Sequence, residues 1–91
     1  MMSQIPIDFN KDPKDVEKQI CRVGMIAELD ATSLYEQLAA ITKSSRIRNM
    51  LLDIAKEEKT HMGEFQALLL EIDKQQEKEL QQGRKEVQEK A

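Results

Sequence analysis

The chain has 91 residues, 40% hydrophobic and 3% aromatic with no tryptophan, which allows one small domain and is typical of an all-helical protein. The formal net charge is -3 with both signs interspersed, so no basic stripe for nucleic acid is present. No run approaches the ~20 apolar residues of a membrane span, and the single Cys21 cannot form an internal disulfide, which favours a reducing compartment. We therefore expect a cytoplasmic protein of one domain, residues 1–91, that binds neither nucleic acid nor membrane.

The chain begins with a segment, residues 1–11, that has no helical period and is expected to form an N-terminal arm. Asp12 and Pro13 then supply a capping carboxylate and a proline suited to the first helical position. A first helix is expected over residues 12–42. Gly24 lies beside its apolar seam and indicates that another helix comes close there. The seam has three- and four-residue spacing and consists of Val16, Ile20, Val23, Ala27, Ala31, Leu34, Leu38 and Ile41.

A short polar break follows, in which Ser44 or Ser45 can cap a second helix over residues 46–72. Two long helices joined by so few residues must run antiparallel. Asp73 can cap a third segment, a weakly anchored helical tail over residues 74–91. The second helix has its own apolar stripe at helical spacing, namely Ile47, Leu51, Ile54, Phe65, Leu68, Leu69 and Ile72.

Two helices cannot enclose a core by themselves, and several apolar residues lie off both stripes. The expected fold is all-α, an antiparallel two-helix hairpin plus a short C-terminal helix. We expect the hairpin to form a homodimer with the architecture of a four-helix bundle, and larger assemblies through the remaining patches. The residues left over are Met25, Ile26, Leu29, Leu52 and Leu70.

The second helix carries a carboxylate and an imidazole three residues apart, Glu58 and His61. This spacing places both side chains on one face, in the middle of the apolar stripe, where leaving them unpaired would cost on the order of several kcal/mol. A cation is the simplest partner. Glu28, at the edge of the first helix's seam, could complete the ligand set.

Carboxylate-bridged di-iron bundles use one Glu from each of two helices and a Glu-x-x-His from each of the other two. One chain supplies half of this set through Glu28, Glu58 and His61, and a two-fold dimer would supply the rest. Mixed carboxylate and imidazole ligation suits iron or manganese better than copper or thiolate-bound zinc.

Two runs of the sequence carry a resemblance to a known family: Ile26-Ala27-Glu28-Leu29-Asp30-Ala31-Thr32-Ser33-Leu34-Tyr35-Glu36-Gln37 and Leu51-Leu52-Asp53-Ile54-Ala55-Lys56-Glu57-Glu58-Lys59-Thr60-His61-Met62-Gly63-Glu64-Phe65. They resemble the ferritin-like domain of the encapsulated ferritins, over about residues 20–87. The resemblance implies that Glu28, Glu58 and His61 are iron ligands and that Tyr35 lies beside the site. It also implies that Asp30 lies near the route by which metal reaches the site, although Ala27 replaces a residue that is acidic in some relatives.

The same resemblance implies a ferroxidase, an enzyme that oxidises Fe(II) to Fe(III) with O2 at a di-iron centre shared by two protomers. Manganese, zinc or calcium could replace iron in a crystal. The dimers would form a larger ring, expected to be a decamer, inside an encapsulin shell protein whose nanocompartment stores the iron. The last residues, Gln88-Glu89-Lys90-Ala91, have no apolar shell-docking character. Free-standing cargo and a domain cut from a shell fusion therefore both stay open.

Two other functions remain open at this point. One is a rubrerythrin-like di-iron peroxidase, against which stands the lack of Cys-x-x-Cys pairs in this sequence. The other is a metal-free helical adaptor, an oligomerisation module in which Glu58 and His61 pair across a dimer seam.

Overall fold

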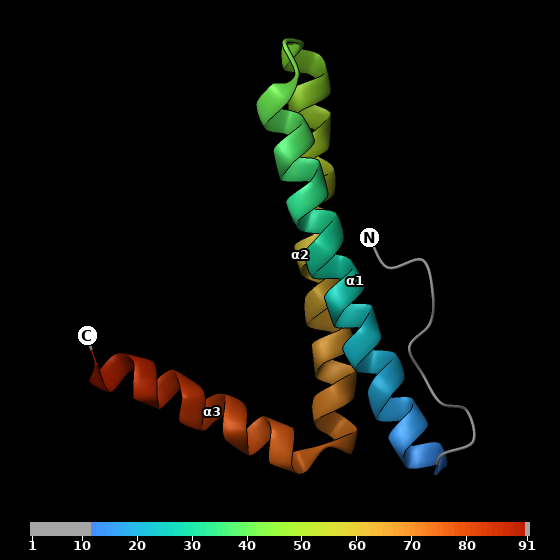
Figure 1. Cartoon of the computed structure of the whole chain (residues 1–91), viewed down its shortest axis with the longest axis vertical. Helices are drawn as coiled ribbons and strands as arrows, with labels where there is room; N and C mark the ends of the chain where they lie inside the picture. Colours follow the sequence, from blue (N-terminus) through green and yellow to red (C-terminus); the bar gives the residue numbers. More distant parts are fainter. Residues whose placement is uncertain (1–11, 91) are drawn as a thin grey trace.

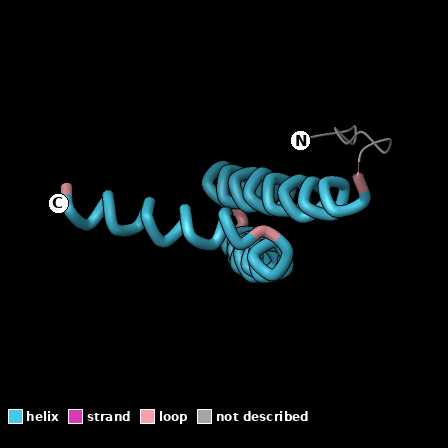
Figure 2. Tube along the Cα trace, turned by 90° about the horizontal axis from the view of Figure 1, so that it is seen from below, coloured by secondary structure: helices cyan, strands magenta, loops and turns pink. Residues whose placement is uncertain are grey.

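The computed structural model describes residues 12–90, which fold into three helices: α1 (Pro13–Ile41), α2 (Ser45–Ile72) and α3 (Lys74–Glu89). α1 and α2 run antiparallel as a long hairpin, and α3 leaves the base of the hairpin sideways (Figure 1). Seen from below, α3 extends away from the end of α2 (Figure 2). The expected all-α fold, a hairpin followed by a short C-terminal helix, is confirmed. The predicted arm over residues 1–11 lies outside the described residues.

Side chains that cap the helices fix the bounds of the hairpin. Asp12 accepts a hydrogen bond from the backbone N–H of Lys14 at 2.8 Å, and Pro13 begins α1. Ser44 accepts one from the N–H of Ile47 at 3.2 Å, so α2 begins at Ser45. The Arg48 guanidinium donates to the carbonyls of Ala39 at 3.2 Å and Thr42 at 2.6 Å. These bonds satisfy carbonyls that the end of α1 would otherwise leave without donors.

Small side chains form most of the contact between α1 and α2, together with Leu69 and the ring of Phe65. The buried residues of the two helices are Cys21, Ala31, Thr32, Ala39, Ala55 and Leu69. A Cβ on Gly24 would lie 2.6 Å from the Phe65 ring, so the close approach predicted at this glycine is made by an aromatic ring of α2. The helices therefore approach closely along a face that has little bulk.

The predicted apolar stripes supply only part of the buried contact between α1 and α2. Ala31 and Leu69 are buried, at 7% and 2% exposed, but several large members of the stripes are not. Ile20 and Ile41 of α1 are 47% and 76% exposed, and Ile47 and Leu68 of α2 are 53% and 51% exposed. Small residues make up most of the buried contact, and these four large side chains are turned to one side. Ile20, Leu68 and Ile72 line one surface hollow. We call the exposed apolar residues on this side the site flank: Ile20, Leu38, Ile41, Ile47, Met50, Leu68 and Ile72.

The opposite side of the hairpin has a second apolar surface, where α3 departs. Of the five residues predicted to lie off the stripes, Ile26, Leu29 and Leu52 are 51%, 51% and 47% exposed. The other two, Met25 and Leu70, are half-buried. A hollow of about 300 Å³, which we call the corner groove, lies where the three helices meet. Its lining residues are Arg22, Met25, Ile26, Leu29, Leu69, Gln76 and Leu80. None of the three described helices combines the length and low polarity needed to cross a bilayer.

Candidate metal centre

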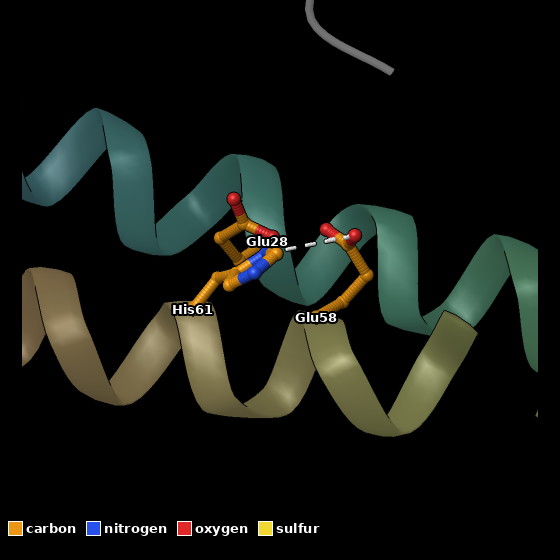
Figure 3. Close-up of side chains that lie close together, drawn as sticks. All are labelled: Glu28, Glu58 and His61. Atoms are coloured by element: carbon orange, nitrogen blue, oxygen red, sulfur yellow. Dashed lines mark ion pairs between the residues drawn. The ribbon is translucent and has the colours of Figure 1, made fainter. Parts of the chain in front are cut away.

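Glu28 from α1 and Glu58 and His61 from α2 converge halfway along the hairpin (Figure 3). Each offers one ligand atom, and these atoms all lie within 4.8 Å of one another. The His61 Nδ1 is 3.6 Å from the Glu28 Oε2 and 3.7 Å from the Glu58 Oε1. Within residues 12–90 this is the one group of three or more potential metal-ligating side chains that lie this close. The structure therefore brings together the three residues that the sequence singles out as ligands.

Helical spacing and small neighbours place Glu28 at the centre of the contact, not at the edge of a seam. Glu28 follows the buried Cys21 by seven residues, two turns of helix, and so lies on the same face of α1. One turn before Glu28, Gly24 packs against Phe65, which itself lies one turn after His61. This close packing holds the backbones near enough for side chains of the two helices to meet.

The three side chains differ in exposure. The Glu28 and Glu58 side chains are 18% and 19% exposed, whereas the His61 side chain is 47% exposed. The position of His61 in the middle of the apolar stripe predicts a buried side chain, and within this chain that prediction was wrong. Two helices can cover the carboxylates between them but leave the imidazole on the outer side, two turns from Leu68 on the site flank.

The Glu28 and Glu58 carboxylates lie so close together that charging both of them is energetically unfavourable. A hydrogen bond between the Glu28 and Glu58 carboxyls raises the pKa of Glu28, burial and repulsion by Glu58 raise it further, and His61 acts in the opposite direction. The Glu28 Oε2 is buried and has no hydrogen-bond partner. Two carboxylates, an imidazole and a buried acceptor without a donor are a donor set that a divalent cation such as iron or manganese satisfies.

The other predicted site residues lie outside this cluster. Tyr35 follows Glu28 by two turns on the same face, is half-buried and is not part of the ligand group. Asp30 is two residues from Glu28, about 200° around the helix, and is not part of the group of ligands. Ala27 is exposed next to Glu28. The roles of Tyr35 and Asp30 stay predictions.

Two polar contacts near the cluster were not predicted from the sequence. Lys59 forms an ion pair with Glu36 across the helices at 3.1 Å. Thr32 donates its hydroxyl to the backbone carbonyl of Glu28 at 2.8 Å. The Thr32 bond follows the common pattern of a hydroxyl binding the carbonyl four residues earlier, but no feature of the sequence pattern predicts that this threonine is buried. The ion pair depends on the register between two helices, which periodicity alone does not set.

Three comparisons with known proteins all find rubrerythrin or ferritin-like proteins. A family profile described as Rubrerythrin matches residues 19–91. A protein of Pyrococcus furiosus named "Ferritin-like-encapsulin shell fusion protein" is 47% identical over 92 aligned positions, which cover 98% of this chain and 27% of that protein. The chain therefore spans about a quarter of that relative's length. The crystal structure of an encapsulated ferritin domain from Pyrococcus furiosus is similar with a TM-score of 0.85 and 46% identity, covering 98% of this chain and 94% of that one.

Proposed function

Because this chain belongs to the rubrerythrin family of ferritin-like proteins, whose members are typically di-iron oxidoreductases, we propose that it is a ferroxidase. The resemblance to encapsulated ferritins found in the sequence is confirmed. The observation that carries the proposal is the convergence of Glu28, Glu58 and His61, with ligand atoms within 4.8 Å of one another. Ferrous iron is the proposed substrate, and dioxygen the oxidant.

We propose that a second copy of the chain completes the centre. One chain offers two carboxylates and one imidazole, half of the set that a di-iron bundle uses. His61 is the most exposed of the three and lies on the same side as the site flank. A copy related by a two-fold axis would cover this flank with its own apolar residues. Apolar packing and the second set of ligands would then be supplied by the same contact.

The chemistry follows from the donor atoms. A pair of ferrous ions held side by side supplies the two electrons that reduce dioxygen. The charged oxygens of Glu28 and Glu58 favour the ferric product over the ferrous substrate, because a harder, more highly charged ion gains more from anionic ligands. His61 presents Nδ1 toward both carboxylates. The Glu58 carboxyl raises the pKa of Glu28 through a hydrogen bond and, to a smaller extent, through repulsion, and a bound cation would counter both effects.

The names of the two relatives bear on the compartment in which the reaction would take place. One relative is named as a fusion of a ferritin-like domain to an encapsulin shell and another as an encapsulated ferritin domain. We propose that this chain likewise works inside an encapsulin shell and delivers oxidised iron for storage there. The hairpin is an open structure with no enclosed space for mineral in the described residues, so a separate container fits the chemistry.

Ferrous addition under anaerobic conditions, followed by air, tests the activity. Absorbance of ferric product should rise rapidly in the wild type. Loss of a partner around a metal ligand typically costs roughly 10–100-fold, so Glu58→Gln and His61→Ala, which remove ligands, should slow the initial rate by more than about 100-fold. Glu57→Gln is the matched control, because Glu57 is an exposed carboxylate on the same helix outside the cluster. Equal rates in the wild type and all three variants would exclude the ferroxidase and leave the metal-free helical adaptor as the function.

A rubrerythrin-like peroxidase is the second candidate, favoured by the family profile. Supplying hydrogen peroxide instead of dioxygen to the ferrous protein separates the two. A ferroxidase should oxidise iron rapidly with dioxygen alone. A protein that reacts rapidly with peroxide and slowly with dioxygen would instead be a peroxidase.

A further inference from the structure

A single residue, Asp73, joins α2 to α3. Its backbone N–H donates to the Leu69 carbonyl at 2.9 Å and so ends α2. Its side-chain Oδ1 accepts from the backbone N–H of Gln76 at 3.0 Å and so begins α3. One residue therefore caps two helices, and the turn between them contains no other residue. The direction of α3 depends on the conformation at this position.

The second carboxylate oxygen of Asp73 is held by the other helix of the hairpin. The Arg22 Nη2 donates to the Asp73 Oδ2 at 2.9 Å, across 51 residues of sequence. The Asp73 side chain is 10% exposed and that of Arg22 48%. The N–H of Gln76 lowers the pKa of Asp73, and Lys18 and Arg22 lower it further. Both oxygens of this carboxylate thus have donors, from two different helices.

Little else holds α3. It has no buried residue among those described, and its large apolar side chains, Leu80 and Val87, are 39% and 72% exposed. In Figures 1 and 2 the helix extends away from the hairpin, which it meets only near its beginning. Among residues 12–90, the Arg22–Asp73 pair is the one side-chain hydrogen bond or ion pair that links the hairpin to the joint or to α3.

We propose that Arg22 and Asp73 form a pin that fixes the direction in which α3 leaves the hairpin. The pin stands at the edge of the corner groove, which Arg22 lines together with Leu80 of α3. Without it, rotation about the backbone at Asp73 would let α3 swing. Leu80 could then move toward Met25 or Leu29 to bury apolar surface, or away from them. The pin therefore determines whether the groove keeps its shape.

The alternative is that Asp73 acts only as a helix cap. In that case the ion pair with Arg22 is screened by water and does not affect the direction of α3. The two roles can be separated by substitution. Asparagine is as good an N-cap as aspartate, so Asp73→Asn keeps the bond from Gln76 but removes the charge that Arg22 binds. Arg22→Gln removes the guanidinium and leaves the cap untouched. Asp73→Ala removes both.

Pulsed electron paramagnetic resonance measures the direction of α3 directly. Spin labels at Lys56→Cys on α2 and Gln88→Cys on α3, in a Cys21→Ala background, give one distance per chain when the labelled protein is diluted with unlabelled protein. The samples contain no added metal, so the result is independent of the proposed ferroxidase function. Helix content is followed by circular dichroism in parallel. Arg46→Gln, at the opposite end of the hairpin from the joint, is the matched control.

The pin predicts a narrow distance distribution in the parent and in Arg46→Gln. Arg22→Gln and Asp73→Asn should broaden or shift the distribution while helix content stays at the parent level. Asp73→Ala should change the distribution and also lower helix content. Distributions equal to the parent in both Arg22→Gln and Asp73→Asn would overturn the proposal. Changes that occur only together with a loss of helix content would also overturn it, because they would assign the effect to capping.

Discussion

Two carboxylates of this chain, Glu28 and Asp73, meet opposite surroundings. The Glu28 side chain faces a second carboxylate, its Oε2 has no hydrogen-bond partner, and its pKa is raised, chiefly through the Glu58 carboxyl. Asp73 receives an N–H on one oxygen and a guanidinium on the other, and its pKa is lowered, chiefly by the N–H of Gln76. Their side chains are similarly protected, at 18% and 10% exposed.

The difference separates a structural carboxylate from one that needs an external partner. Asp73 is satisfied by its own chain and stabilises the joint. Glu28 is held in an unfavourable charge environment by the packing of α1 on α2. A fold that keeps such a residue at its centre is consistent with a functional site, where local stability is commonly sacrificed.

The largest expected contrast is the response to metal. Mn²⁺ is a suitable probe because, unlike Fe²⁺, it is not readily oxidised by air at neutral pH. At roughly 100 times its dissociation constant a ligand stabilises the folded state by about 2.7 kcal/mol, which for a domain of this size raises the unfolding midpoint by roughly 10 °C or more. We expect this shift in the wild type and in Asp73→Asn, and none in Glu28→Gln. Scanning calorimetry measures it. An equal shift in Glu28→Gln would place the metal elsewhere.

Without metal, the same substitution should have the opposite effect. Glu28→Gln removes one of two crowded charges and supplies an N–H that can donate to Glu58. We expect the unfolding midpoint of the metal-free protein to rise by a few degrees, since about 1 kcal/mol corresponds to roughly 4–8 °C in a domain of this size. Asp73→Ala should lower the midpoint, because a cap and an ion-pair partner are lost. A fall in the midpoint of Glu28→Gln would show that the charge of Glu28 stabilises the fold.

The sequence predicts the cluster better than it predicts its surroundings. Glu58 and His61 are predicted together because their three-residue spacing on one helix follows from helical geometry. Glu28 is predicted as a carboxylate of the facing helix that could complete the ligand set, and the resemblance to encapsulated ferritins implies the same role. Asp12 is predicted as a cap for the same reason, and Ser44 as one of two candidates beside Ser45, since capping is local.

Packing between the helices was predicted less well. Periodicity finds the most apolar face of each helix, but it does not state whether that face meets the other helix of the same chain or another surface. Small residues such as Ala39 and Ala55, each 2% exposed, contribute little to a hydrophobic pattern and yet form the contact. The Arg22–Asp73 pair could not be predicted from the sequence either, because it depends on the direction in which α3 turns at one residue.

The two carboxylates should also give opposite pH dependences in the metal-free protein. The pKa of Glu28 is raised above its ordinary value of 4.5, so the stability that its protonated form provides is complete below 4.5 and is lost as pH rises through the raised value. The pKa of Asp73 is lowered from 3.8, so its contribution is present above 3.8 and is lost as pH falls through the lowered value.

Urea unfolding over an acidic pH series measures both slopes. Relative to the wild type, Glu28→Gln should gain stability as pH rises above 4.5. Asp73→Asn should have a lower free energy of unfolding than the wild type above pH 3.8. This difference from the wild type should become smaller as the pH falls below 3.8. The comparison fails if both variants change in the same direction over the same range.

A third carboxylate, Glu36, gives the smallest expected effect and a baseline for the other two. Its ion pair with Lys59 spans α1 and α2 at 3.1 Å, beside the cluster, but the side chains are 48% and 60% exposed. Water screens such a pair, so Lys59→Gln should change the free energy of unfolding by at most about 0.5 kcal/mol, and less at high salt. The Mn²⁺ shift should stay at the wild-type value, because neither residue belongs to the ligand group. A loss of metal stabilisation in Lys59→Gln would mean that this pair helps to position Glu58. An exposed carboxylate, Glu36, would then also contribute to metal binding, and burial alone would not identify the functional carboxylates of this hairpin.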